Sequence, residues 1–138
     1  MNLKEGLLLD NGTEINWNCS YENVLELLSS FSLIKEENNK HNYKSICTNT
    51  KTLGLEKVLR TKFSFVNNKL VSINFSKCEH SAYNLEDIMN DLIVIFGKPD
   101  FSNSKKIGWY FGKVVLQYCK IQIDDYFNEY LEININNK

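Results

Sequence analysis

Hydrophobic and polar residues alternate strictly in the middle of the chain. Over residues 57–65 the less polar positions of this alternation are Leu59, Thr61, Phe63 and Phe65. A period of two is typical of a strand with one face in solvent. Residues 70–75 repeat the pattern after the turn-forming sequence Asn67-Asn68-Lys69, so we expect the two strands to pair as an antiparallel meander.

Turn-forming residues separate further short hydrophobic segments. Asn11-Gly12 lies between residues 7–9 and 13–17 and predicts a first hairpin, because Asn-Gly accepts the positive φ of a tight turn. Towards the C-terminus, Gly112-Lys113 and residues 124–128 are the expected turns. The strands expected around them cover residues 107–111, 114–123 and 129–135. Another strand is expected at residues 43–48, between polar loops at residues 35–42 and 49–56.

Two segments have the period of an amphipathic helix. Residues 21–31 follow Ser20, a favourable N-cap, and their apolar face consists of Tyr21, Val24, Leu25 and Leu28. Residues 85–96 follow Asn84, which forms the spacing of a capping box with Asp87. Both segments therefore predict helices with one buried face.

These elements predict an α+β fold with a mainly antiparallel sheet and two helices packed on one of its faces, in one globular domain over residues 1–138. Residues 21–75 and 85–135 both begin with a helix and continue with strands. After the N-terminal hairpin, this order is explained equally well by tandem α-βββ units and by convergence on one arrangement of layers. The sheet residues expected to be buried are Phe63, Phe65, Ile73, Phe75, Ile121, Leu131 and Ile133.

Composition and charge narrow the classes of partner. The chain has 138 residues, with 16 Lys+Arg against 17 Asp+Glu and a formal net charge of −1, which disfavours nucleic acid and anionic membranes as partners. The N-terminal segment has only the short apolar run Leu7-Leu8-Leu9, too short for a signal peptide or a membrane span. We therefore expect a cytoplasmic protein whose four cysteines are reduced.

No motif in the sequence predicts an active site. The two histidines, His41 and His80, fall in polar connections, where exposure is more common than catalysis. Cys78 and His80 are the one close pair of metal-ligand type, whereas zinc sites usually have two such pairs. The sequence also lacks a glycine-rich phosphate loop. We expect no catalytic residue, no cofactor and no metal.

Two groups of acidic residues are the candidate partner-binding sites. The first surrounds the last hairpin and consists of Asp124, Asp125 and Glu129 with the aromatic residues Tyr126, Phe127 and Tyr130. The second lies on the polar side of the second helix and consists of Glu86, Asp87 and Asp91. A polar turn and a solvated helix face explain these groups without any function. Acids mixed with aromatics are also typical of an interface for a basic protein.

The segment Phe96-Gly97-Lys98-Pro99-Asp100 closes the second helix and is followed by Trp109 in a hairpin and by an alternating last strand. This pattern resembles small bacterial immunity proteins of toxin–antitoxin type, which protect cells against their own polymorphic toxins, in particular those of contact-dependent growth inhibition systems. The resemblance implies a non-enzymatic α+β domain that binds a cognate toxin, often a nuclease, and inhibits it. Under this hypothesis, charge reversal at Asp124, Asp125 and Glu129 weakens toxin binding more than reversal at Glu36 and Glu37.

Two other functions are consistent with the sequence. A small-molecule or peptide binding module would use the sheet face, with Trp109 or Tyr118 stacked on the ligand, although the alternation around Trp109 favours a core position. A hydrolase or transferase would use Cys78 or Cys119 as nucleophile with His80 as base. We consider the protein-binding interpretation the strongest of the three.

Overall fold

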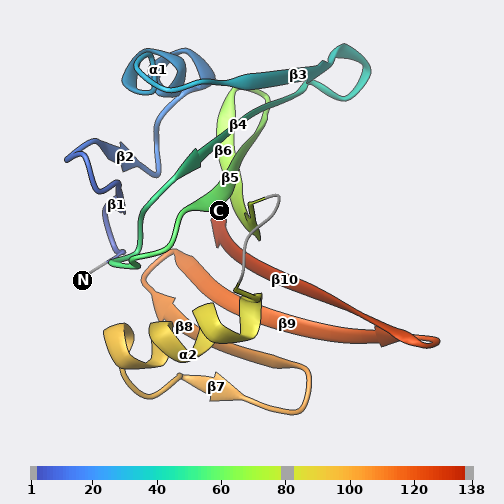
Figure 1. Cartoon of the computed structure of the whole chain (residues 1–138). Helices are drawn as coiled ribbons and strands as arrows, with labels where there is room; N and C mark the ends of the chain where they lie inside the picture. The colour runs from blue at the N-terminus through green and yellow to red at the C-terminus, as the bar shows by residue number, and fades with distance from the viewer. Residues whose placement is uncertain (1–2, 79–82, 136–138) are drawn as a thin grey trace.

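The computed structural model describes residues 3–78 and 83–135, and of Ile123, Tyr126 and Phe127 it describes the backbone alone. Strands make up about half of these residues, and two α-helices accompany them (Figure 1). The predicted α+β class with a mainly antiparallel sheet is therefore confirmed.

The chain begins with the predicted hairpin, followed by the first helix. Strands β1 (Gly6–Leu8) and β2 (Glu14–Asn16) pair as a separate two-stranded sheet. Helix α1 (Tyr21–Leu27) begins at Ser20, whose side chain accepts a hydrogen bond from the backbone N–H of Asn23. The helix ends before the predicted residue 31, because turns replace the helical hydrogen bonds beyond its C-cap at Leu28.

Eight strands form one antiparallel sheet in the order β3-β4-β5-β6-β10-β9-β8-β7. The bounds of the strands before the second helix are β3 (Ile34–Asn38), β4 (Tyr43–Thr50), β5 (Leu59–Val66) and β6 (Lys69–Lys77). Those after it are β7 (Phe101–Ser102), β8 (Lys106–Phe111), β9 (Val114–Ile123) and β10 (Tyr126–Ile135). Strands β6 and β10 pair at the centre, so the two parts of the chain meet there.

One face of this sheet forms the core. A single row of paired residues runs across six strands from β4 to β8, and all of its members are at most 2% exposed: Ile46, Phe63, Ile73, Ile133, Leu116 and Trp109. Buried residues of both helices belong to the same core. Removing one such side chain from water contributes about 1.5–3 kcal/mol, so the row is a major source of stability.

The second helix and its flanks fit the sequence closely. Helix α2 (Leu85–Phe96) has the predicted bounds and the predicted capping box between Asn84 and Asp87. Gly97 ends it at φ +83° and ψ −159°, a conformation open almost only to glycine. The indole N–H of Trp109 donates to the Gly97 carbonyl at 3.1 Å, which ties the end of the helix to the sheet.

Three predictions about the sheet are wrong. The turn expected at residues 124–128 consists of Asp124 and Asp125 alone, because residues 126–128 pair with β9 as part of β10. The polar residues expected as a loop at 35–42 form strand β3 and the short 3₁₀ helix η1 (Asn39–His41). All five β3 side chains are exposed, and the strand is held by its backbone pairing to β4. Ile121, expected in the core, is 42% exposed, because this part of β9 extends beyond the neighbouring strand β8.

Candidate functional site

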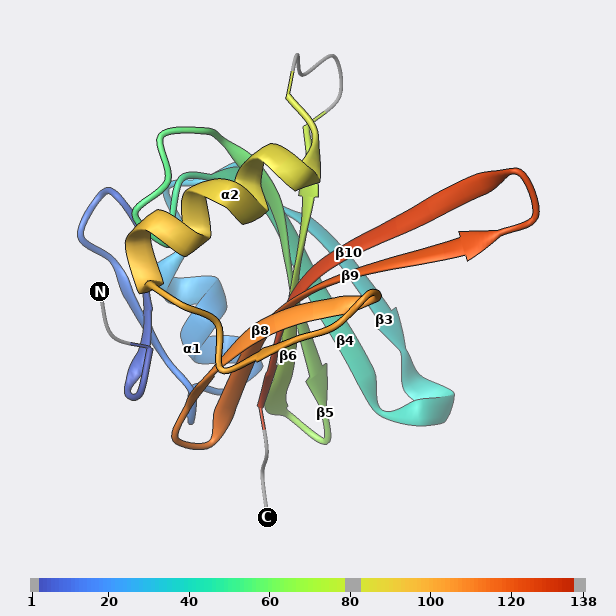
Figure 2. The same ribbon diagram turned by 90° about the horizontal axis from the view of Figure 1, so that it is seen from below.

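The end of the β9–β10 hairpin projects from the sheet. The pairing of β10 with β6 begins only at Leu131, and the pairing of β9 with β8 ends at Cys119. Residues 121–130, here called the arm, therefore have no strand neighbour outside the hairpin in the described part of the chain. Figure 2 shows the arm standing clear of the other strands.

The arm brings together much of the first predicted acidic group. Asp124 and Asp125 are exposed at its tip, where Asp124 has a positive φ of 52° in the two-residue turn. Ile121 and Tyr130 are 42% and 43% exposed. They lie on one face of the arm, because Tyr130 pairs with Cys119 and Asn128 pairs with Ile121. The side chains of Tyr126 and Phe127 lie outside the described residues.

A tyrosine at the base of the arm connects the two acidic groups. The hydroxyl of Tyr118 donates to Oε1 of Glu129 at 2.8 Å, and Tyr118 itself is only 5% exposed. Burial, this hydrogen bond and the negative charges of Glu129 and Glu86 raise the pKa of Tyr118. The charges of Glu86 on α2 and Glu129 on β10 thus both disfavour ionisation of the Tyr118 hydroxyl.

The other two helix acids have structural contacts. The carboxylate of Asp87 accepts from the backbone N–H of Asn84 at 3.2 Å, as part of the capping box. Asp91 forms an ion pair with Lys57 at 3.2 Å, which connects α2 to the loop before β5. The predicted group on α2 is therefore divided, and only Glu86 faces towards the base of the arm.

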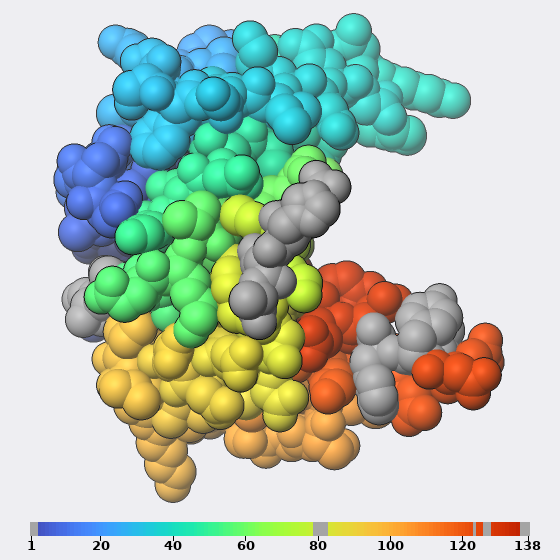
Figure 3. Space-filling view, in the orientation of Figure 1, coloured from blue at the N-terminus to red at the C-terminus, as the bar shows by residue number. Residues whose placement is uncertain are grey.

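The face of the large sheet opposite the core, here called the open face, is lined by polar side chains. The row beside the core row contains Cys47, Lys62, Asn74, Glu132, Gln117 and Gly108. The next row contains Ser45, Ser64, Ser72, Asn134, Val115 and Tyr110. Figure 3 shows the molecule hollowed between the β3–β4 end of the sheet and the arm.

Exposed hydrophobic side chains are concentrated on this face. Nine large hydrophobic residues are exposed in the described part of the chain. By strand register, the members of this set on the open face are Ile34, Val66, Tyr110, Ile121 and Tyr130. Aromatic residues are enriched at protein interfaces, and Tyr110 and Tyr130 are the aromatic members of this set. The alternation in β5 and β6 predicts a polar face on these two strands. It does not predict which other strands extend that face.

A hydrogen-bonded network occupies the centre of the open face. Oε1 of Glu132 accepts from the side-chain amides of Gln117 at 2.7 Å and Asn134 at 3.1 Å. Oε2 accepts from the side-chain amide of Asn74 at 3.3 Å. Glu132 is half-buried, and its carboxylate is held in one orientation by neutral donors from three strands. Sequence reasoning missed this group, because its members come from strands distant in the chain.

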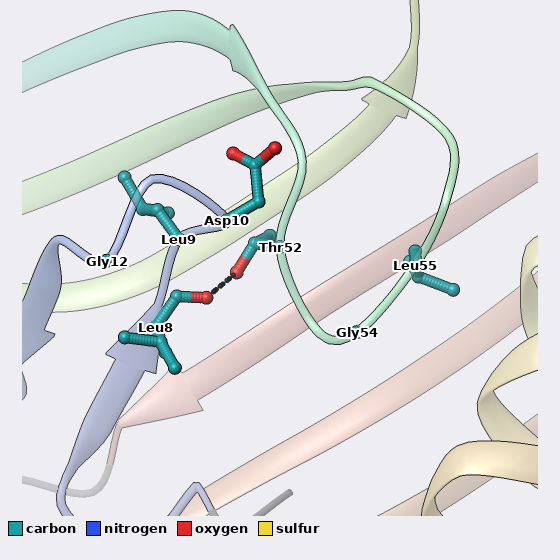
Figure 4. Close-up of a pocket in the computed structure, with 7 residues that line it drawn as sticks. All are labelled: Leu8, Leu9, Asp10, Gly12, Thr52, Gly54 and Leu55. Carbon is teal, nitrogen blue, oxygen red and sulfur yellow. Dashed lines mark hydrogen bonds between the residues drawn. The ribbon is translucent and has the colours of Figure 1, made fainter.

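A separate shallow cavity of about 200 Å³ lies between the β1–β2 turn and the loop after β4 (Figure 4). Leu8, Leu9 and Leu55 are among its lining residues, and Asp10 is the one ionisable residue in that lining. The hydroxyl of Thr52 donates to the carbonyl of Leu8 at 2.7 Å and so holds the two walls together. A single carboxylate among leucines lacks the second group that acid–base chemistry needs.

Most of the described residues on which the two alternative functions depend are buried. Trp109 and Tyr118 are 2% and 5% exposed, so the prediction that they stack on a ligand is wrong. Burial raises the pKa of the Cys78 and Cys119 thiols, which disfavours the reactive thiolate. His80 lies outside the described residues. Among the residues that the structure does describe, no group of three or more His, Cys, Asp and Glu could hold a metal ion.

No protein-family model matches the chain, and no curated protein or solved structure matches it either. Within residues 3–78 and 83–135, neither helix is long and apolar enough to cross a membrane.

Proposed function

We propose that this protein is a non-enzymatic protein-binding domain whose interface is formed by the arm and the adjoining open face. The observation that carries the proposal is the arm, which presents Ile121, Tyr130 and two tip carboxylates away from the rest of the sheet. Apolar and aromatic side chains supply binding energy at interfaces, and charges at the periphery steer the encounter. The acidic tip favours a basic partner.

The more specific proposal is an immunity protein that binds a cognate bacterial toxin, such as a nuclease, in the cytoplasm and neutralises it. Support comes from the resemblance of Phe96-Gly97-Lys98-Pro99-Asp100 and Trp109 to the pattern of such immunity proteins. The acidic arm also suits the basic substrate groove of a nuclease. We also propose that residues 21–75 and 85–135 are tandem α-βββ units whose helices pack on the core face.

The proposal is tested by affinity purification from the source cells, with charge reversal at the arm. We expect one basic protein, toxic when expressed alone, to bind wild type and to lose at least tenfold in affinity for the double variant Asp124→Lys, Asp125→Lys. The matched control reverses Glu36 and Glu37, which are exposed neighbours on β3. Glu129 is left unchanged because it accepts a hydrogen bond from Tyr118. Equal losses from both double variants would refute the arm as the interface.

The sheet-face binding module stays a second candidate, because the open face gathers five of the exposed hydrophobic side chains of the described residues. Its aromatic contacts would come from Tyr43 and Tyr110 instead of Trp109. A ligand that protects these two tyrosines from chemical modification, with no effect of the arm variants, would favour this module.

A further inference from the structure

The carboxylate of Glu132 lies near the centre of the large sheet, on the strand that joins its two parts. Asn74, Gln117 and Asn134 donate to it from β6, β9 and β10 itself. All of these donors are neutral amides, so they orient the carboxylate without cancelling its charge. The group is half-buried, and part of its surface can still be reached from outside.

Two cations on the open face, Lys62 and Arg60, contact other groups, and a third, Lys106, lies on this face by its pairing with Cys119. The ammonium of Lys62 lies over the ring of Tyr43, 5.9 Å from its centroid. The guanidinium of Arg60 donates to Sγ of Cys47 at 3.2 Å. Within the described residues, Glu132 takes part in no ion pair. A fixed carboxylate without a cation is an incomplete arrangement, because charges in half-buried positions are usually paired.

The hydrogen bonds already formed indicate what kind of cation fits. A carboxylate offers about four acceptor positions, and Oε1 uses two of its positions while Oε2 uses one. A guanidinium in its preferred two-point arrangement needs one open position on each oxygen. An ammonium needs a single position and binds as a compact point charge. The open position on Oε2 therefore suits lysine better than arginine.

We propose that the open face receives a lysine side chain of the protein partner, whose ammonium donates to Oε2 of Glu132. This inference rests on the proposed function and specifies the chemistry of the partner at the centre of the face. The neutral amides hold the acceptor in place before binding, so little conformational entropy is lost when the ammonium arrives. The acidic arm and this carboxylate attract the same basic surface.

The test is a nuclear magnetic resonance titration of the whole protein with Nα-acetyl-lysine amide at low salt. The signals observed are the side-chain amides of Asn74, Gln117 and Asn134, which contact the carboxylate directly. We expect saturable shifts of all three. The neutral probe Nα,Nε-diacetyl-lysine amide should bind at least tenfold more weakly, and Nα-acetyl-arginine amide more weakly than lysine.

Two variants complete the design. Glu132→Gln should abolish the response, whereas Glu36→Gln, which removes a carboxylate from β3 on the same face, should leave it unchanged. Should Glu132→Gln fold poorly, the charged and neutral probes still decide the question on wild type. Absent shifts, equal binding of the neutral probe, or tighter binding of the arginine probe would overturn the proposal.

Failure of this inference and failure of the proposed function have different signatures. If the arm variants abolish partner binding while Glu132→Gln leaves it unchanged, the protein-binding function stands and the lysine contact is refuted. If the lysine probe binds wild type but the arm variants do not affect partner binding, the carboxylate site stands and the arm assignment is refuted.

Discussion

Replacement of Tyr118 by phenylalanine removes one hydroxyl and leaves the ring in place. Tyr118 is 5% exposed, and its hydroxyl donates to Glu129 at 2.8 Å. Hydrogen bonds to charged groups contribute about 1.5–3 kcal/mol to stability. Because the half-buried Glu129 can recover contact with water, we expect the lower part of this range, a loss of about 1.5–2 kcal/mol in the free energy of unfolding.

The assay is urea denaturation at pH 7, followed by circular dichroism. Tyr130→Phe is the matched control: Tyr130 lies on the same hairpin but is 43% exposed, so we expect a change within about 0.5 kcal/mol. A double-mutant cycle with Glu129→Gln should give a coupling of about 1 kcal/mol between the two side chains. Zero coupling, or a Tyr118→Phe variant as stable as wild type, would refute the claim that this hydrogen bond stabilises the base of the arm.

Three further predictions concern the ionisation of Tyr118, the indole of Trp109 and the backbone of Gly97. Because the pKa of Tyr118 is raised in the folded state, the neutral hydroxyl stabilises the fold below the unfolded value of about 10 and this contribution is lost at higher pH. Urea denaturation from pH 9 to 11.5 should show a shallower decline for Tyr118→Phe. Trp109→Phe, which removes the hydrogen bond to Gly97, should cost about 2–3 kcal/mol by chemical denaturation, whereas Tyr110→Phe, at a 59% exposed position, should be neutral. Gly97→Ala should cost about 1–3 kcal/mol in the same assay because of its backbone conformation, and Gly112→Asn, at φ +60°, less than about 1 kcal/mol.

Local signals predicted most of the fold. Helix α2 has its predicted bounds because the capping box and Gly97 define both ends within the segment itself. Strand β3 was missed because its side chains are all exposed, and an edge strand held by backbone pairing leaves no hydrophobic period. The apolar positions of β9 change phase near Tyr118, which is explained by a bulge or by strong twist, and the unbroken pairing of β9 with β10 excludes the bulge. A register shift does occur between β5 and β6, at the pairs of Ser64 and Phe65.

The candidate site was predicted only in part. The sequence places Asp124 and Asp125 in a turn, and the structure confirms this position. The sequence could not predict that the charges of Glu86 and Glu129 both affect the pKa of Tyr118, because this depends on how α2 lies against the sheet. The same limit applies to Glu132, whose donors come from strands distant in the chain. Such groups form where segments distant in the chain come together, and the hydrophobic pattern of one segment does not predict which other segments it contacts.

Site-specific photo-crosslinking in the source cells tests the protein-binding account most directly. A photoreactive amino acid replaces Asp125 at the tip of the arm or, as the control, Val94 on α2, which is 84% exposed. The account predicts a crosslink to one basic protein from position 125 and none from position 94, with loss of the crosslink when Asp124 is reversed to lysine. Equal crosslinks from both positions, or none from position 125, would contradict it.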